Sequence, residues 1–364
     1  MAKKRIIKYK YLNILVVIIL SLILVILLTP LTLRLLLRIK GYTRESAELI
    51  YKEDLTKRML DNEYNKTLDM IMTGGKYDKE YLDRYLSIEY VDNEGFIEHL
   101  NDLLKNKYTD DQIKKIYAYN NKIVLEYTVK NEVNDIEKYL EVDIFKPDRL
   151  DRYRKQTMED YKERVMFVNL DRDKKDFEDP NIIKEYSTTM LVNKHNKLDE
   201  KFEPEVVLLT KCSSGEEYLS KEAKEAYDKM CDASLKDGMK LGVNSSYRSF
   251  ADQTSVYNYY LKHNGQAYVN KYVATPGYSE HQTGLALDVK SLRGDIFKYT
   301  KEYTWMLNNS YKYGFVLRYP EEKQEILGYS YESWHYRYVG VEIATYMHEN
   351  NLIYEEYYVQ FLDK

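Results

Sequence analysis

Residues 279–289 read SEHQTGLALDV and contain a histidine and an aspartate on either side of a glycine. His281 lies seven residues before Asp288, and positions seven apart along one continuous strand point to opposite faces. Gly284 can interrupt the strand, so we expect His281 to lie on a turn that precedes it. In the strand that follows, alternation places Ala286 on the same face as Asp288, where its small side chain leaves room for a metal ion. The stretch therefore predicts a turn and a strand that bring His281 and Asp288 together.

A second stretch, residues 332–335, reads ESWH and supplies a carboxylate three residues before another histidine. Two histidines and one aspartate suit zinc, and three protein ligands leave a fourth position for water, as in catalytic sites. A nearby glutamate that is not a ligand can take the proton of that water. We therefore expect a metal site at His281, Asp288 and His335, with Glu332 as the base. The remaining histidines stand in polar or amphipathic contexts and are expected at the surface: His99, His195, His263 and His348.

Strand and helix patterns are mixed from residue 161 onward, without a regular strand–helix–strand order. Ser220 and Ser249 each stand where a helix cap is expected, the second with Asp252 in a capping-box position. The patterns predict strands over 165–168, 191–194, 206–209, 240–246, 285–290 and 315–317, with helices over 221–237, from 250, around Trp305 and over 341–349. This mixture favours an α+β fold over a doubly wound sheet.

The N-terminus predicts a membrane anchor. Residues 12–33 form a run of 22 residues without a charge, which as a helix is about 33 Å long and can cross a hydrocarbon core of about 30 Å. Five Lys and Arg residues precede this run, so the positive-inside rule places residues 1–11 in the cytoplasm and the body outside. The alternative is a cleaved signal peptide, which would have a shorter apolar region and a small-residue cleavage site. We expect residues 1–41 to be a cytoplasmic tail and a retained transmembrane helix of a single-pass protein.

Charge and cysteine content exclude several classes of protein. Residues 1–40 hold eight basic and no acidic side chains, so the rest carries 47 basic and 59 acidic side chains, a formal charge of −12. An acidic body argues against nucleic acid as a partner. Two cysteines cannot form a four-cysteine zinc site. Cys231 falls on the apolar face of its predicted helix and is expected as a buried thiol, although a disulfide with Cys212 is permitted outside the membrane.

Three blocks of sequence resemble the VanY-type D-alanyl-D-alanine carboxypeptidases, which are zinc peptidases of the bacterial cell wall. The blocks are SSYRS at 245–249 followed by Gln253, TPGYSEHQTGLALD at 275–288, and GFVLRYP at 314–320 with YESWHYRYVG at 331–340. The resemblance extends over about residues 165–350 and does not include the preceding region. It implies a small α+β domain on an antiparallel sheet, of the hedgehog/DD-peptidase type, which we assign to residues 161–364.

The resemblance also implies roles for individual residues. His281, Asp288 and His335 match the zinc ligands of the family, and Glu332 matches its catalytic base. Arg248 matches the arginine that steadies the substrate carbonyl and its oxyanion. Two further positions, Gln253 and Ser279, match polar residues that hold the end of the peptide.

The resemblance therefore implies a zinc carboxypeptidase that removes the terminal D-Ala from peptidoglycan stem peptides. The alternatives are an L,D-carboxypeptidase, a stem endopeptidase, and a non-enzymatic wall-binding or sensory protein. An intact Glu332 speaks against the last of these, because a binding protein needs no base.

Residues 42–160 predict a helical stalk. The segment is rich in Lys, Glu, Asp and Tyr and contains no proline before Pro147. Thr109 and Gln112 form a capping-box pattern, and Asp78 is a plausible helix cap, whereas residues 123–129 fit either a helix or a strand. The tetrapeptide LDRY occurs at 82–85 and at 150–153, a weak sign of duplication. We expect a spacer; the alternative is a small module that binds a wall polymer or a partner protein.

Overall fold

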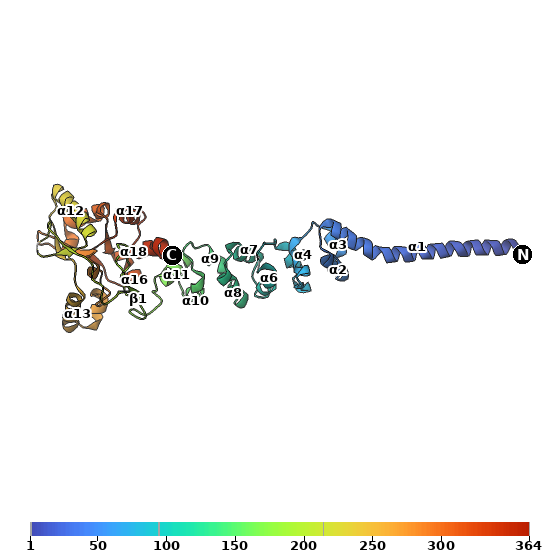
Figure 1. Cartoon of the computed structure of the whole chain (residues 1–364), viewed down its shortest axis with the longest axis horizontal. Helices are drawn as coiled ribbons and strands as arrows, with labels where there is room; N and C mark the ends of the chain where they lie inside the picture. The colour runs from blue at the N-terminus through green and yellow to red at the C-terminus, as the bar shows by residue number, and fades with distance from the viewer. Residues whose placement is uncertain (1, 94, 214, 364) are drawn as a thin grey trace. The chain divides into compact units, whose positions relative to one another are not determined.

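A computed structural model describes residues 2–93, 95–213 and 215–363, and its contacts divide the chain into two compact units, residues 1–150 and 151–364 (Figure 1). The first unit contains a long apolar helix and a series of short helices. The second contains a four-stranded sheet and all the residues that we expect to carry chemistry.

Helix α1 spans Ala2–Lys40 and contains the predicted anchor. From Ile14 onward it is long enough and apolar enough to cross a membrane, and none of its most apolar window is buried inside the protein. Side chains such as Val17, Leu24 and Val25 are exposed in the absence of lipid. A signal sequence near an N-terminus has the same properties, so the length and composition of the helix fit either a membrane span or a signal sequence.

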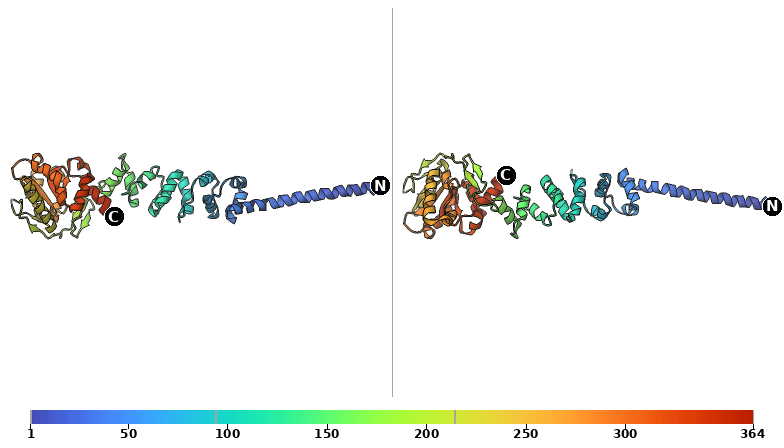
Figure 2. Two further views of the ribbon diagram at one scale, coloured as in Figure 1. Left: turned by 90° about the horizontal axis from the view of Figure 1, so that it is seen from above. Right: turned by 90° about the horizontal axis from the view of Figure 1, so that it is seen from below.

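The short helices of the first unit form a repeating stack (Figure 2). Their side chains bind backbone carbonyl groups 21 or 22 residues further along the chain: Thr67 Oγ1 donates to Ile88 O, Asn106 Nδ2 to Thr128 O, and Gln112 Nε2 to Asn134 O. Recurring separations of similar length are typical of repeat architectures, in which each unit contacts its neighbours. The helices are α2 (Arg44–Lys52), α3 (Thr56–Asp61), α4 (Lys66–Thr73), α5 (Leu82–Ser87), α6 (Phe96–Lys105), α7 (Asp110–Tyr119), α8 (Lys122–Lys130) and α9 (Ile136–Leu140).

The helix caps that the sequence predicts in this region are confirmed. Thr109 and Gln112 form a capping box at the start of α7, and Asp78 caps the turn before α5. The ambiguous residues 123–129 are helical and lie in α8.

The two LDRY segments occupy equivalent structural positions. Each follows a 3₁₀ turn, Lys79–Tyr81 in one case and Pro147–Arg149 in the other. Tyr85 is fully buried and donates its hydroxyl to Asn101 Oδ1 at 2.5 Å. Tyr153 is also fully buried and donates to Asn169 Oδ1 at 2.6 Å, again 16 residues further along the chain. The repeated sequence therefore corresponds to a repeated structural element.

The second unit opens with α10 (Leu150–Arg154, whose first residue closes the first unit) and α11 (Tyr161–Asn169). The predicted strand over 165–168 is therefore wrong. Its apolar residues Val165 and Val168 lie three apart, which places them on one face of a helix, and both are buried. The predicted strand over 191–194 is also wrong. Only an isolated bridge forms there, between Asn193 and Asn196.

The central sheet has the strand order β5–β6–β8–β7, and all its pairings are antiparallel. Its strands are β5 (Leu241–Ser245), β6 (Ala286–Ser291), β7 (Phe315–Tyr319) and β8 (Glu332–Tyr338). Two smaller sheets pair β1 (Asn181–Ile183) with β2 (Asn196–Leu198), and β3 (Val207–Leu208) with β4 (Tyr218–Leu219). The α+β class and the small antiparallel sheet are confirmed, and the sequence missed β8.

One face of this sheet forms the core. Leu287 and Val289 of β6 pack with Tyr336 of β8 and with Tyr227 and Met306 from two helices. These helices are α12 (Lys221–Lys236), which Ser220 caps as predicted, and α15 (Lys301–Asn309). The remaining helices are α13 (Phe250–Asn264), α14 (Gln266–Tyr272), α16 (Gln324–Leu327), α17 (Val341–Glu349) and α18 (Tyr354–Tyr357). In Figure 1, α12 and α13 lie on opposite sides of the strands.

The oxidation state of the cysteines differs from the buried thiol that the sequence favoured. Cys231 is fully buried on α12 as predicted, but it forms a disulfide with Cys212 rather than remaining a thiol. Cys212 lies in the loop after β3 with a left-handed backbone, φ 46°, and its Cα is 6.0 Å from that of Cys231. The path of this loop depends on tertiary structure, which the helical pattern around Cys231 does not reveal.

Candidate metal centre

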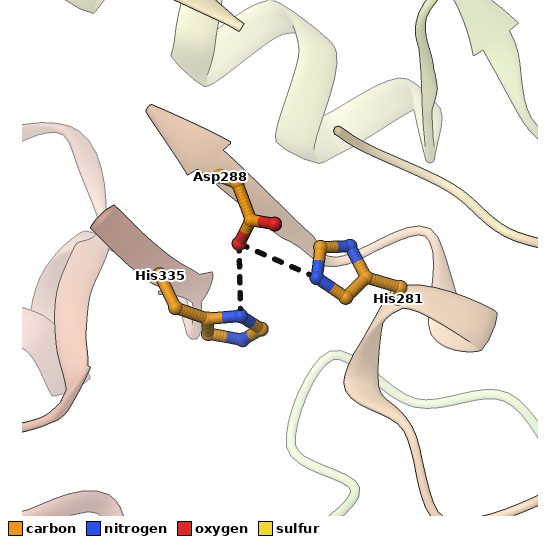
Figure 3. A group of neighbouring side chains, drawn as sticks. All are labelled: His281, Asp288 and His335. Atoms are coloured by element: carbon orange, nitrogen blue, oxygen red, sulfur yellow. Dashed lines mark ion pairs between the residues drawn. The ribbon is translucent and has the colours of Figure 1, made fainter. Parts of the chain in front are cut away.

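Two adjacent strands and one turn bring the predicted ligands together (Figure 3). His281 lies on the 3₁₀ turn Glu280–Thr283, which ends at Gly284 with φ +70°. A Cβ atom at Gly284 would lie 2.9 Å from Val206 Cγ1 and 3.1 Å from the Ser220 backbone nitrogen, so both the turn and its packing require glycine. Asp288 of β6 then pairs directly with His335 of β8.

The three side chains converge on one buried point. Asp288 Oδ1 lies 3.4 Å from His281 Nε2 and 3.2 Å from His335 Nδ1. One ligand atom from each residue lies within 4.8 Å of the others. Among the described residues Asp288 Oδ1 has no hydrogen-bond partner, although it is buried. A buried carboxylate oxygen that faces two imidazole nitrogens fits a cation, and this donor set suits zinc.

Hydrogen bonds on the outer side of each ring determine which nitrogen faces the centre. His281 Nδ1 lies 2.7 Å from the carbonyl oxygen of Ser246, so it carries the proton and leaves Nε2 free. His335 Nε2 lies 3.3 Å from Glu280 Oε2, which leaves Nδ1 free. The two histidines therefore present different nitrogens to the same point.

The electrostatic surroundings of the two rings differ. Burial, with Arg248 nearby, lowers the pKa of His281 to about 4, so this ring is neutral. Burial opposes charge on His335 as well, but Asp288 and Glu280 outweigh it and raise the pKa of His335 to about 9. A metal ligand must be unprotonated, so metal binding would release a proton from His335.

Glu332 begins β8 and lies beside the three ligands without joining them. Its Oε2 is 3.8 Å from His335 Nδ1, and its carboxylate is not part of the group that converges on the centre. Burial raises the pKa of Glu332 to about 7. A carboxyl group with this pKa can accept and release a proton near neutral pH.

Arg248 is held on the other side of Asp288. Its Nη2 lies 3.3 Å from Asp288 Oδ2, while Nε donates to Ser245 Oγ and Nη1 donates to Gln253 Oε1, both at 2.9 Å. Gln253 is buried and donates its Nε2 to Ala274 O at 2.7 Å. The guanidinium group is therefore fixed by its neighbours before any ligand binds.

All seven residues singled out by the sequence line one cavity of about 550 Å³: Arg248, Gln253, Ser279, His281, Asp288, Glu332 and His335. A wall of tyrosines, which the sequence analysis did not identify, lines the same cavity. Tyr268 of α14 lies between Tyr260 and Tyr272, with ring centroids 5.7 Å and 4.9 Å apart. Their spacing along α13 and α14 is the same as that of tyrosines in ordinary helix packing, so the sequence does not indicate that they line the cavity.

The surface prediction for the other histidines needs one correction. His195 is buried, and its Nε2 lies 3.5 Å from Arg172 Nη1 and 3.7 Å from Asp176 Oδ1. Burial lowers the pKa of His195. Among the described residues it does not belong to the metal-binding group.

Comparisons with known proteins agree with this site. Residues 216–341 match a family model described as VanY: D-alanyl-D-alanine carboxypeptidase. The putative carboxypeptidase YodJ of Bacillus subtilis is 39% identical over 179 residues, which cover 46% of this chain and 66% of YodJ. The bifunctional D-Ala-D-Ala dipeptidase and D-Ala-D-Ala carboxypeptidase VanXYC of Enterococcus gallinarum is 37% identical over 181 residues, or 47% of this chain and 94% of VanXYC.

Solved structures with similar sequences include two peptidases. The vancomycin-resistance D,D-pentapeptidase VanY, solved in complex with Zn(II), is 34% identical, and the match covers 47% of this chain and 98% of that protein with a TM-score of 0.43. The LD-carboxypeptidase LdcB is 36% identical over 51% of this chain and 92% of LdcB, with a TM-score of 0.47. Since the chain matches nearly the full length of VanXYC at 37% identity, and the family model includes all seven cavity residues, the chain belongs to the VanY family of D-alanyl-D-alanine carboxypeptidases.

Proposed function

We propose that this protein is a zinc-dependent carboxypeptidase that removes the terminal D-Ala from peptidoglycan stem peptides ending in D-Ala-D-Ala. The observation that carries this proposal is the buried convergence of His281, Asp288 and His335 beside a carboxylate that is not a ligand. The family supports the class of substrate, because VanXYC is named as a D-Ala-D-Ala dipeptidase and carboxypeptidase.

The metal ligands in this proposal are His281 Nε2, Asp288 Oδ1 and His335 Nδ1. A zinc ion bound by these residues would supply Lewis acidity and lower the pKa of a water molecule to about 7. Asp288 contributes the negative charge that favours a cation at this point. The hydrogen bonds from His281 to Ser246 and from His335 to Glu280 hold the rings in the orientation that ligation needs.

The proposed base is Glu332. Its carboxylate takes a proton from the attacking water and later delivers it to the nitrogen of the departing D-alanine. The peptide C–N bond breaks, the acyl carbon gains the water oxygen, and the amine leaves with the transferred proton. Burial of Glu332 favours this shuttle, since it brings the pKa of the carboxyl close to neutral pH.

Arg248 is proposed to stabilise negative charge on the substrate. A guanidinium group can hold carbonyl or carboxylate oxygens through two parallel hydrogen bonds, which lysine cannot copy. Its contacts with Ser245 and Gln253 fix its position, so little reorganisation is needed when charge develops. Gln253 and Ser279 complete the group of polar residues that we propose for the peptide end.

The alternatives concern the same cavity. An L,D-carboxypeptidase or a stem endopeptidase would use the same metal ligands and base and would differ in how the peptide is held. A non-enzymatic wall-binding or sensory protein is disfavoured, because Glu332 is retained at the position where a base is needed.

We further propose that the chain is a single-pass membrane protein with its C-terminal domain outside the cytoplasm. In this arrangement residues 1–41 form the tail and anchor, residues 42–160 form a helical spacer, and residues 161–364 form the catalytic domain. Helix α1 and the cations at its start support this arrangement.

The metal proposal predicts about one zinc ion per chain and loss of activity on chelation, with recovery when zinc is restored. Metal analysis of purified protein measures the first, and assays of stem-peptide cleavage measure the second. His281→Ala should lose the metal. His263→Ala should retain it, because His263 is exposed and contacts Tyr259 O. Full activity after exhaustive chelation would contradict the proposal.

The base proposal predicts that Glu332→Gln lowers kcat by at least about 100-fold while zinc stays bound, because the amide keeps the shape but cannot accept a proton. Cleavage rate and metal content are measured on the same preparation. A rate within tenfold of the wild type would mean that another group is the base, and loss of zinc would make Glu332 a ligand.

The exopeptidase proposal predicts that amidation of the substrate carboxylate lowers kcat/KM by about 10- to 100-fold, since a charged hydrogen-bonding partner is lost. The comparison uses a stem pentapeptide ending in D-Ala-D-Ala with a free or amidated end, and mass spectrometry identifies the products. Equal cleavage of both peptides, or a cut inside the stem, would favour the endopeptidase. Preferential cleavage of a tetrapeptide ending in one D-Ala after an L-residue would favour the L,D-carboxypeptidase.

The topology proposal predicts that protease added to intact cells removes the C-terminal domain while the protein remains in the membrane fraction. An antibody against residues 161–364 follows the domain, and a cytoplasmic protein serves as the control for cell integrity. Recovery of the intact chain in the cytosol, or a mature protein that begins near residue 34, would disprove the arrangement.

A further inference from the structure

A group of four buried charged residues lies behind the metal centre, and one of them, Glu280, contacts the proposed ligand His335. Its members are Glu280, Arg318, Arg337 and Glu355, and none of them is more than 2% exposed. They come from the turn that carries His281, from β7, from β8 and from α18 near the C-terminus. We call these four residues the buried ionic cluster.

Glu280 is the centre of the cluster. Its Oε1 accepts hydrogen bonds from Arg318 Nε at 2.7 Å and from Arg337 Nη1 at 3.0 Å. Its other oxygen, Oε2, faces His335 Nε2 at 3.3 Å. One oxygen therefore binds the two arginines, and the other is left for the metal-binding histidine.

The two arginines are themselves held by other parts of the domain. Arg318 makes a two-pronged contact with Glu355, at 2.7 Å and 2.5 Å. Arg337 Nη2 donates to the carbonyl oxygens of Thr188 at 3.0 Å and Met190 at 2.8 Å. Thr188 lies 149 residues before Arg337, and Glu355 lies 37 residues after Arg318. Both are thus connected to Glu280 through the two arginines.

The charges of the cluster balance. Two carboxylates and two guanidinium groups sum to zero, so the cluster is tolerated in the interior only as a complete set. Arg318 and Arg337 both donate to Oε1 of Glu280, which is the pairing expected for a carboxylate. A carboxylate can only accept hydrogen bonds, so the nitrogen of His335 that faces Oε2 is the donor.

We propose that Glu280 is a positioning residue of the metal centre, which orients His335 so that Nδ1 faces Asp288, and that Arg318, Arg337 and Glu355 hold Glu280 in place. This inference rests on the proposed metal site. The arrangement is the one in which a carboxylate behind a ligating histidine fixes the ring and its tautomer. The cluster also connects the C-terminal segment to the metal centre: Glu355 binds Arg318, 37 residues earlier, and Arg318 binds Glu280, a further 38 residues earlier.

The test is the zinc affinity of the full-length protein in detergent, measured by competition with a chromophoric chelator. Glu280→Gln keeps the shape but removes a charge, which leaves unbalanced positive charge beside the cation and weakens the bond to His335. We expect the zinc dissociation constant to rise about 10- to 100-fold and kcat/KM to fall at equal zinc occupancy.

Glu302→Gln is the matched control. Glu302 is also fully buried, and it accepts hydrogen bonds from Arg293 Nε and the Lys240 backbone nitrogen, both at 3.0 Å. It is not among the residues that line the metal cavity. We expect this variant to lower the melting temperature while the zinc affinity of the folded protein stays within about twofold of the wild type.

The outcomes separate this inference from the function on which it rests. If wild-type protein binds no zinc, the metal site itself is wrong and the inference falls with it. If the wild type binds zinc and Glu280→Gln binds it equally well, only the positioning role is wrong. Equal weakening in the Glu280 and Glu302 variants would assign the effect to general stability and overturn the inference.

A second variant covers the case in which Glu280→Gln does not fold. Glu355→Gln removes the same amount of charge from the cluster but leaves the contact between Glu280 and His335 in place. We expect a rise of several-fold in the zinc dissociation constant, smaller than that of Glu280→Gln. An unchanged zinc affinity in folded Glu355→Gln protein would overturn the role of the cluster.

Discussion

The functional site depends on the antiparallel pairing of β6 with β8. This pairing places Asp288 directly opposite His335, and directly opposed residues in such a pair have Cα atoms about 4.5–5.5 Å apart. The next pair along the ladder, Leu287 with Tyr336, points to the other face and enters the core. A slip of one residue would turn Asp288 toward the core and Leu287 toward the cavity. The burial of Leu287 and Tyr336 therefore maintains the register that the metal centre needs.

The sequence predicted those parts of the site that depend on local pattern. The alternation after Gly284 predicted both the strand and its faces, and a capping box begins α13 at Ser249 as expected. Non-local features were missed. β8 escaped notice because Ser333 and His335 are polar yet buried, so its burial does not follow hydrophobicity. The short apolar run at 165–168 was assigned to a strand because periodicity alone cannot separate a helix from a strand over four residues. Contacts between residues distant along the chain, such as that of Arg337 with Thr188, could not be predicted because no local sequence pattern indicates them.

The balance of positive and negative side chains differs between the two sides of His335. The buried ionic cluster is neutral and closed, because each of its charges has a partner within the protein. Once His335 has lost its proton, as a metal ligand must, the cavity side holds Asp288 and Glu332 against the positive charge of Arg248, so it carries an excess negative charge when both carboxyl groups are ionised. Burial makes this excess costly, which is the reason that the pKa of Glu332 rises. A divalent cation would compensate the excess and favour the ionised base. The cavity side of His335 therefore has an excess of negative charge that a bound cation would neutralise.

The two units of the chain differ in how far along the sequence their stabilising contacts reach. In the first unit, hydrogen bonds such as those of Thr67 and Gln112 connect residues about one repeat apart, so each helix depends on its neighbours. In the second, Arg337 binds a carbonyl group 149 residues away, and His335 is connected to α18 through Glu280 and Arg318. A repeat stack can gain or lose a unit without disturbing distant residues, whereas the peptidase domain must retain segments from Thr188 to Glu355 together. The length of the first unit can therefore vary at little structural cost, while the proposed catalytic site depends on contacts between distant segments of the second unit.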